Sequence, residues 1–150
     1  MAGKNHVERS FLIQVDDSGG TARDLSTGLV RASISGIGLI YEEADMTGVS
    51  DGVVNFLTNH PSSTISATFH LDDTATTGAF TVLKGIEGGA AGTLTCQFGQ
   101  SGAAPTSGDP EWEGEYIFTG MQVSFDGGKA VIAGTFVPGS ATAPAWGTVA

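Results

Sequence analysis

The sequence predicts an all-β fold, a β-sandwich or barrel-like subunit with one flanking α-helix. Apolar and polar residues alternate along several segments, as they do in strands with one buried face. The 150 residues include 23 glycines and only 5 prolines, which indicates many turns. This length suits a single hydrophobic core. We therefore expect one domain over residues 1–150, with terminal arms at 1–9 and 138–150.

The first third of the chain is expected to hold a series of short strands. Residues 11–15 alternate between apolar and polar types, and the turn-forming run 16–20 follows them. A hairpin partner should come next. Alternation also predicts strands over 28–35 and 39–44, and the polar segment 45–52 then breaks the pattern.

The clearest strands lie in the middle and at the end of the chain. Alternation is regular over 64–71 and again over 93–98. Two β-rich runs, 116–125 and 129–137, are joined by Asp126-Gly127-Gly128, a sequence typical of a tight hairpin turn. We expect all four segments to belong to the sheet.

Only one segment has helical spacing of its apolar residues, and it covers 74–86. Residues 51–59 are interpreted as a short helical turn that Pro61 ends. The stretch 99–110 is expected to be a loop. The single cysteine, Cys96, falls on the apolar side of its strand and excludes an internal disulfide.

The charge of the chain argues against binding to nucleic acid or to an anionic membrane. The formal net charge is −10, from 6 basic and 16 acidic residues. Residues 1–31 are neutral, so Lys84 and Lys129 are the only cations in the remaining acidic part. Phosphate binding requires clustered lysine and arginine. The N-terminal segment also lacks the apolar stretch of a signal peptide.

One motif invites an enzymatic interpretation. Gly48-Val49-Ser50-Asp51-Gly52 matches the G-x-S-x-G pattern of hydrolase nucleophile elbows. That elbow requires a preceding strand, a following helix and a parallel α/β sheet. A β-rich chain of this length does not supply them, so a plain turn is favoured. We expect no enzyme, and a hydrolase using Ser50 is the weakest of three hypotheses.

No metal, cofactor or catalytic site is expected. Glu111, Glu113 and Glu115 would share one strand face, where oxygen ligands can attract calcium. No calcium-binding loop surrounds them, so a solvated acidic edge is the better interpretation. The three histidines lack metal-site spacing. Trp112 and Trp146 are interpreted equally as packing anchors or as partner contacts.

Short motifs occur in an order that resembles the major tail proteins, which build the tail tube of long, flexible-tailed bacteriophages. They are Asp24-Leu25-Ser26, then Asp45-Met46-Thr47 followed by Gly48 and Asp51, then Phe69-His70-Leu71-Asp72. The resemblance covers about residues 10 to 137. Residues 48–51 depart from it, because the family has a Gly-Asp pair there. The patterns apply equally to the related tubes of contractile tails and secretion systems.

The resemblance implies a structural virion protein of the tail, assembled in the host cytoplasm. Its subunits would form hexameric rings, their strands would contribute to a ring-shaped β-barrel, and the stacked rings would conduct DNA during ejection without binding it specifically. Partners would be further copies of the chain, the tape measure and the tail-end proteins, and no membrane. Unpaired sheet edges would be completed by neighbouring copies.

Inter-ring contacts are expected over residues 41–54 and at both termini. The candidate residues are Tyr41, Glu42, Glu43, Asp45, Met46 and Asp51. The main alternative is a β-sandwich binding module, either a capsid decoration protein or a carbohydrate-binding domain. Its platform would be Trp112, Tyr116 or Trp146.

Overall fold

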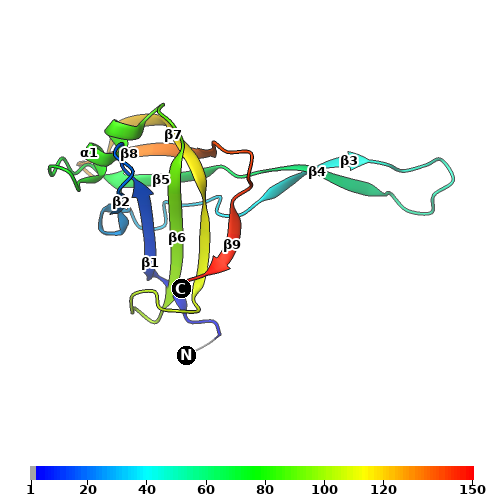
Figure 1. Cartoon of the computed structure of the whole chain (residues 1–150), viewed down its shortest axis with the longest axis horizontal. Coiled ribbons are helices and arrows are strands. Elements are labelled where there is room, and N and C mark those ends of the chain that lie inside the picture. Colours follow the sequence, from blue (N-terminus) through cyan, green and yellow to red (C-terminus); the bar gives the residue numbers. More distant parts are fainter. Residues whose placement is uncertain (1–2) are drawn as a thin grey trace.

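A computed structural model describes residues 3–150 as a curled antiparallel sheet with a long two-stranded hairpin projecting from it (Figure 1). In chain order the elements are β1 (His6–Asp16), β2 (Ala22–Asp24), the 3-10 helix η1 (Ser26–Gly28), β3 (Ile40–Asp45), β4 (Phe56–Ser62), β5 (Ile65–His70), α1 (Ala79–Ile86), β6 (Gly92–Gln100), β7 (Pro110–Asp126), β8 (Lys129–Pro138) and β9 (Ala145–Thr148). The main sheet has the order β2-β1-β6-β7-β8-β5, with β9 paired to β7, and β3 pairs only with β4.

The sheet curls because β7 is long and bends. Its pairing with β8 shifts register between Thr119 and Gln122, and Gly120 within this bulge has a φ of +70°. Such a positive φ suits glycine, and a bulge of this kind bends its strand. In Figure 1, β5 and β8 run across the direction of β1 and β6. The resulting half-barrel confirms the predicted all-β class with one short helix.

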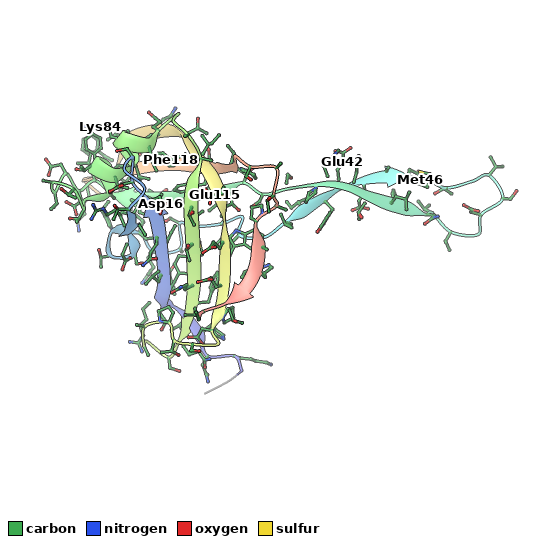
Figure 2. The ribbon with its side chains drawn as sticks, in the orientation of Figure 1. Asp16, Glu42, Met46, Lys84, Glu115 and Phe118 are labelled. Atoms are coloured by element: carbon green, nitrogen blue, oxygen red, sulfur yellow. The ribbon has the colours of Figure 1, made fainter. Side chains whose placement is uncertain are left out.

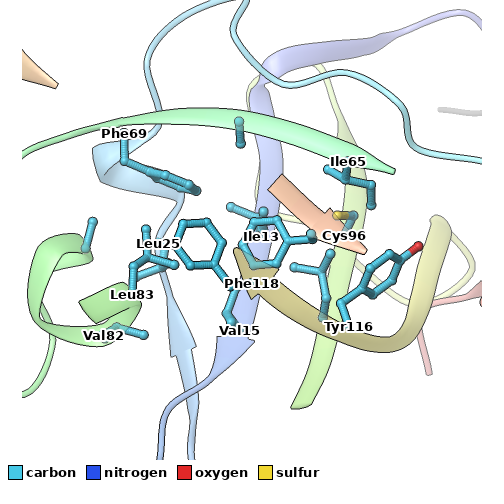
Figure 3. Packing of buried hydrophobic residues seen from close by; sticks show 14 of the residues in the cluster. Ile13, Val15, Leu25, Ile65, Phe69, Val82, Leu83, Cys96, Tyr116 and Phe118 are labelled. Atoms are coloured by element: carbon cyan, nitrogen blue, oxygen red, sulfur yellow. The ribbon is translucent and has the colours of Figure 1, made fainter. Parts of the chain in front are cut away.

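The concave side of this sheet holds the core. Side chains that alternate along the strands, such as Ile13, Ile65 and Cys96, are fully buried, and Phe118 lies among them (Figure 3). Helix α1 closes one end by burying Val82 and Leu83. The predicted strands around 11–15, 64–71, 93–98, 116–125 and 129–137 are therefore confirmed, as is the turn at 126–128.

A hydrogen-bonded chain crosses the core. The Nε1 of Trp112 donates to the hydroxyl of Tyr116 over 2.9 Å, and this hydroxyl shares a hydrogen bond of 2.8 Å with Ser63. All three residues are at most 3 % exposed. Burial raises the pKa of Tyr116 above its ordinary value. Buried polar groups need hydrogen-bond partners, so these two hydrogen bonds fix the position of Ser63 relative to β7.

The prediction of a strand over residues 28–35 is wrong. The segment makes only the isolated bridges Leu29–Phe69 and Ser35–Ser66, and Ala32 turns it with a φ of +59°. The segment instead covers the outer edge of β5, because the Val30 amide donates to the carbonyl of Thr68 over 2.9 Å. One sheet margin is thus capped by the chain itself.

Two helical expectations also change. The helix predicted at 74–86 is shorter, since α1 begins at Ala79 and the Asp72 carboxylate instead accepts from Thr74 in the preceding turn. The helical turn expected at 51–59 is wrong, because its second half begins β4. Pro61 lies within β4. A proline has no backbone N–H to donate, and it is tolerated here because β4 pairs with β3 on one side and is an edge strand on the other.

The remaining segments are placed as follows. The loop expected at 99–110 is confirmed between β6 and β7. Of the expected terminal arms, residues 1 and 2 lie outside the described residues, His6–Arg9 belong to β1, and β9 pairs with β7. No helix in the described part of the chain is long and apolar enough to cross a membrane.

Candidate functional site

The most distinctive surface of the molecule is the projecting hairpin, here called the hairpin arm (residues 40–62). Figure 1 shows it extending well beyond the body. Its strands pair Ile40 with Ser62 at the base and Asp45 with Phe56 near the tip. Every residue of β3 is exposed, and in β4 only Pro61 is partly buried. The hairpin arm therefore contributes little to the core.

The hairpin arm nevertheless carries large apolar side chains. Most of the exposed large hydrophobic residues among the described ones belong to it, namely Ile40, Tyr41, Met46, Val49, Val53, Val54, Phe56 and Leu57. Monomeric proteins rarely expose a contiguous apolar patch of this kind unless it contacts a partner. The side chains also include acids such as Glu42, which Figure 2 shows on the hairpin arm nearer the body than Met46.

The tip of the hairpin arm is shaped by its own hydrogen bonds. The Thr47 amide donates to Asp45 Oδ1 over 2.9 Å, and the Gly48 amide donates to Asp51 Oδ2 over 2.7 Å. The Asn55 amide donates to Thr47 Oγ1 over 2.8 Å. The hydrogen bonds from the Thr47 side chain and amide lower the pKa of Asp45.

Ser50 lies in this tip loop, between the two strands of an antiparallel hairpin. The strand, sharp turn and helix of a nucleophile elbow are not formed around it. Ser50 is exposed, whereas His60 lies in β4 near the base of the hairpin arm and His70 lies in β5 of the body. The G-x-S-x-G match is therefore a turn sequence.

The structure brings all six predicted contact residues together on the hairpin arm. Tyr41, Glu42, Glu43 and Asp45 lie on β3, and Met46 and Asp51 lie in the tip loop. Sequence reasoning missed the apolar residues of the returning strand, Phe56 and Leu57 above all. Pro61 argued against a strand here. One signal did favour it, because a strand at 39–44 followed by a polar turn is expected to have a returning β-rich partner.

A second notable surface is the glutamate face, formed on the convex side of β6 and β7 by Thr93, Thr95, Gln97, Glu111, Glu113 and Glu115. Each glutamate accepts from the residue opposite it: Gln97 donates to Glu111 over 2.6 Å, Thr95 to Glu113 over 3.3 Å, and Thr93 to Glu115 over 2.8 Å. Uncharged donors hold the carboxylates, so the face keeps its negative charge. The predicted shared face of the three glutamates is confirmed.

The described residues contain no cluster of metal ligands, and the cysteine among them is buried. Residues 3–150 contain no group of three or more His, Cys, Asp or Glu side chains placed to hold a metal ion. Cys96 is fully buried, and burial raises its pKa to about 12. Such a thiol is inert at neutral pH.

The two tryptophans differ in role. Trp112 is fully buried, whereas Trp146 on β9 is 55 % exposed and packs edge-on against Trp112 with ring centroids 5.0 Å apart. Trp112 is thus a packing anchor. The suggested binding platform is wrong for Trp112 and for Tyr116, which is 3 % exposed, and of the three suggested residues only Trp146 is exposed.

The fold is similar to that of several solved tail and injection-system components. The sheath/tube terminator of an extracellular contractile injection system, PVC, shares 16% identity over 98% of this chain and 99% of its own, with a TM-score of 0.63. The tail of an empty GTA particle, refined with C6 symmetry, shares 18% identity over 95% of this chain and 97% of its own, with a TM-score of 0.61. The tube-terminating cap of the anti-feeding prophage shares 11% identity over 99% of this chain and 95% of its own, with a TM-score of 0.67.

At these identities the comparison establishes a shared fold. The chain has a tail-tube-like fold over nearly its whole length, and each of these structures is described as a tail, tube or cap component. No family model matches the sequence, and no curated protein matches it.

Proposed function

We propose that this chain is a structural protein of a phage or phage-like tail. Its copies form hexameric rings that stack into a tube, and the tube conducts DNA during ejection. The observation that carries this proposal is an exposed, apolar hairpin arm on a tail-tube-like fold. The C6 symmetry of the similar GTA tail supports the ring number.

The hairpin arm supplies the contact between rings. Transfer of apolar area from water stabilises by about 25 cal/mol per Å², so burying the exposed half of side chains such as Phe56 or Leu57 gives roughly 1 kcal/mol each. In the isolated chain this exposed half stays in water, since Phe56 is 50 % and Leu57 55 % exposed. The contact residues Tyr41, Glu42, Glu43, Asp45, Met46 and Asp51 lie beside this apolar surface.

The glutamate face is proposed as the lining of the bore. Its residues carry hydroxyl, amide and carboxylate groups and include no lysine or arginine. DNA has about one negative charge per 1.7 Å of helix axis, and basic side chains would hold it. A wall of this composition lets the duplex slide. Strands of adjacent copies would join at open edges to make the ring-shaped barrel.

The location that follows is the tail of a particle assembled in the host cytoplasm. A tape measure protein inside the tube and tail-end proteins at its termini are the further partners. The similar terminator and cap structures show that the same fold serves both within tubes and at their ends. We assign this chain to the tube because its hairpin arm presents apolar surface for another copy.

Electron microscopy of the purified protein tests this function. We expect rings of six subunits and stacked tubes with an open bore. A particle that stays monomeric at every salt concentration and protein concentration tried would contradict the proposal. A tube whose bore is lined by arginine and lysine would contradict the assignment of the glutamate face.

A further inference from the structure

A groove of about 360 Å³ lies between the N-terminal half of β1 and the segment that follows η1. Its apolar lining comes from Phe11, Leu29 and Val30, and three charged residues, Glu8, Arg9 and Arg31, also line it. We call it the β1 groove.

The β1 groove lies beside an open strand edge. Strand β2 pairs only with Gln14–Asp16 of β1, and the backbone of Ile13 is satisfied by Ser26 Oγ and by the amide of Leu25. Within the described part of the chain, no strand pairs with residues 6–12 on this side. The opposite margin of the sheet, at β5, is covered by the chain itself. An additional element can therefore pack here without displacing a strand.

The two basic residues of the groove lack acidic partners in their own chain. Within residues 3–150, neither Arg9 nor Arg31 has a carboxylate within 4.0 Å, whereas Arg23 pairs with Asp17 over 2.8 Å. Both groove arginines are exposed. The one acid of the groove, Glu8, accepts a hydrogen bond from the Ala32 amide, so two arginines against one glutamate leave the groove with an excess of positive charge in a molecule of net charge −10.

The hairpin arm has the complementary composition. Residues 40–62 include four acids and no lysine or arginine. In a two-stranded ribbon, the two side chains of a cross-strand pair point to the same face, and every second pair along the strands points to that face again. The pairs Glu43–Thr58 and Asp45–Phe56 are two residues apart on β3, so one face presents an aromatic ring flanked by two carboxylates.

We propose that this face of the hairpin arm docks in the β1 groove of a second copy. Phe56 covers Phe11, Leu29 and Val30, while Glu43 and Asp45 meet Arg9 and Arg31. The occupant comes from another copy because the hairpin arm projects away from its own body (Figure 1). This inference rests on the proposed function, since it names the surface that receives the contact between copies.

Charge exchange tests the pairing. Arg31→Glu and Glu43→Arg each place like charges together, so each should raise the protein concentration needed for assembly by about tenfold or more. The combined variant restores opposite charges and should return this concentration to within about threefold of the unaltered protein. Lys129→Glu, on the remote β7–β8 turn, is the matched control and should assemble normally.

A disulfide trap gives an independent readout. Thr27 in the groove and Thr58 on the hairpin arm are both exposed, and the native Cys96 is buried. Mixed Thr27→Cys and Thr58→Cys proteins should form an intermolecular disulfide under mild oxidation. Thr58→Cys mixed with Ser124→Cys should not.

The outcomes separate the two proposals. If the unaltered protein and Lys129→Glu form tubes, but the combined variant is no better than the single ones and the Thr27–Thr58 disulfide does not form, the β1 groove is the wrong receptor and the tube function stands. If the unaltered protein never assembles, both proposals are overturned.

Discussion

The body and the hairpin arm use the same alternating strand sequence to different ends. In the body, alternate residues such as Ile65, Ala67 and Phe69 of β5 are at most 3 % exposed. In β3, every residue is exposed, including Ile40 and Tyr41. Apolar residues in the body are buried in the isolated chain, whereas those in the hairpin arm keep about half or more of their surface for contact with another molecule.

The two regions also differ in what supports their strands. The body has a seven-stranded sheet around a core, whereas the hairpin arm is a two-stranded ribbon with hydrogen bonds at its tip. An isolated two-stranded ribbon is at best marginally stable in water. Changes in the body should therefore alter unfolding, and changes in the hairpin arm should alter assembly.

The largest effect on stability is expected for Trp112→Ala. The substitution leaves a cavity in the core and removes the hydrogen bond to Tyr116, so the free energy of unfolding should fall by about 3 to 5 kcal/mol. Urea unfolding followed by circular dichroism measures it. An unfolding free energy that the substitution leaves unchanged would contradict the buried position of Trp112.

A smaller effect is expected where strands approach closely. A methyl group at Gly134 would collide with the ring of Phe118, so Gly134→Ala should cost about 1 to 3 kcal/mol of unfolding free energy. Gly147 on β9 has no atom within 4 Å of such a methyl group. Gly147→Ala is therefore the matched control, and equal melting temperatures for the two variants would contradict the packing described for the body.

Two tyrosines extend the comparison to single hydroxyl groups. Tyr116→Phe leaves Trp112 and Ser63 without their buried partner and should cost about 1 to 2 kcal/mol in thermal or urea unfolding. Tyr41 on the hairpin arm is 49 % exposed, so Tyr41→Phe should leave unfolding unchanged. A comparable loss in both variants would remove the distinction between body and arm.

The smallest effects on stability are expected at two similar turns, one formed by Asp45 and Thr47 in the hairpin arm and one by Asp72 and Thr74 in the body. Hydrogen bonds from Thr47 lower the pKa of Asp45, and those from Thr74 lower that of Asp72. A lowered pKa in the folded state means that the stabilisation is present above the unfolded value of about 3.9 and is lost as pH falls through the folded value. Both turns should therefore weaken only below about pH 4.

NMR titration of the two carboxyl groups checks this expectation. Thr47→Ala should raise the pKa of Asp45 towards its ordinary value and leave Asp72 unchanged, because the side-chain hydrogen bond is the main cause of the shift. Thr74→Ala should do the converse. An Asp45 that titrates identically with and without the Thr47 hydroxyl would contradict the turn geometry at the tip.

The fold was predictable where residues alternate and one face is buried. The strands around residues 65–70 and 93–98 and the turn at 126–128 followed from local pattern and turn chemistry. Segment 28–35 also alternates, yet it lies along β5 as a loop because tertiary contacts and the positive φ of Ala32 decide its path. Alternation alone does not reveal such contacts.

The candidate site was predictable in part. Asp45, Met46 and Asp51 belong to the polar segment predicted at 45–52, and the other predicted contact residues belong to the strand predicted before it. Phe56 and Leu57 were instead assigned to a helical turn, because adjacent apolar residues fit helical spacing as well as strand spacing. The β1 groove combines residues from two separate segments. Only the folded structure brings them together.

Shortening the hairpin arm tests the central claim most directly. Residues 43–58 would be replaced by an Asn-Gly turn that joins Glu42 to Asn59, and the variant compared with the full chain by urea unfolding, sedimentation and electron microscopy. We predict an unfolding free energy within about 1 kcal/mol of that of the full chain, together with complete loss of tubes. Tubes that still form from the shortened chain, or a body that no longer folds without its hairpin arm, would contradict the account.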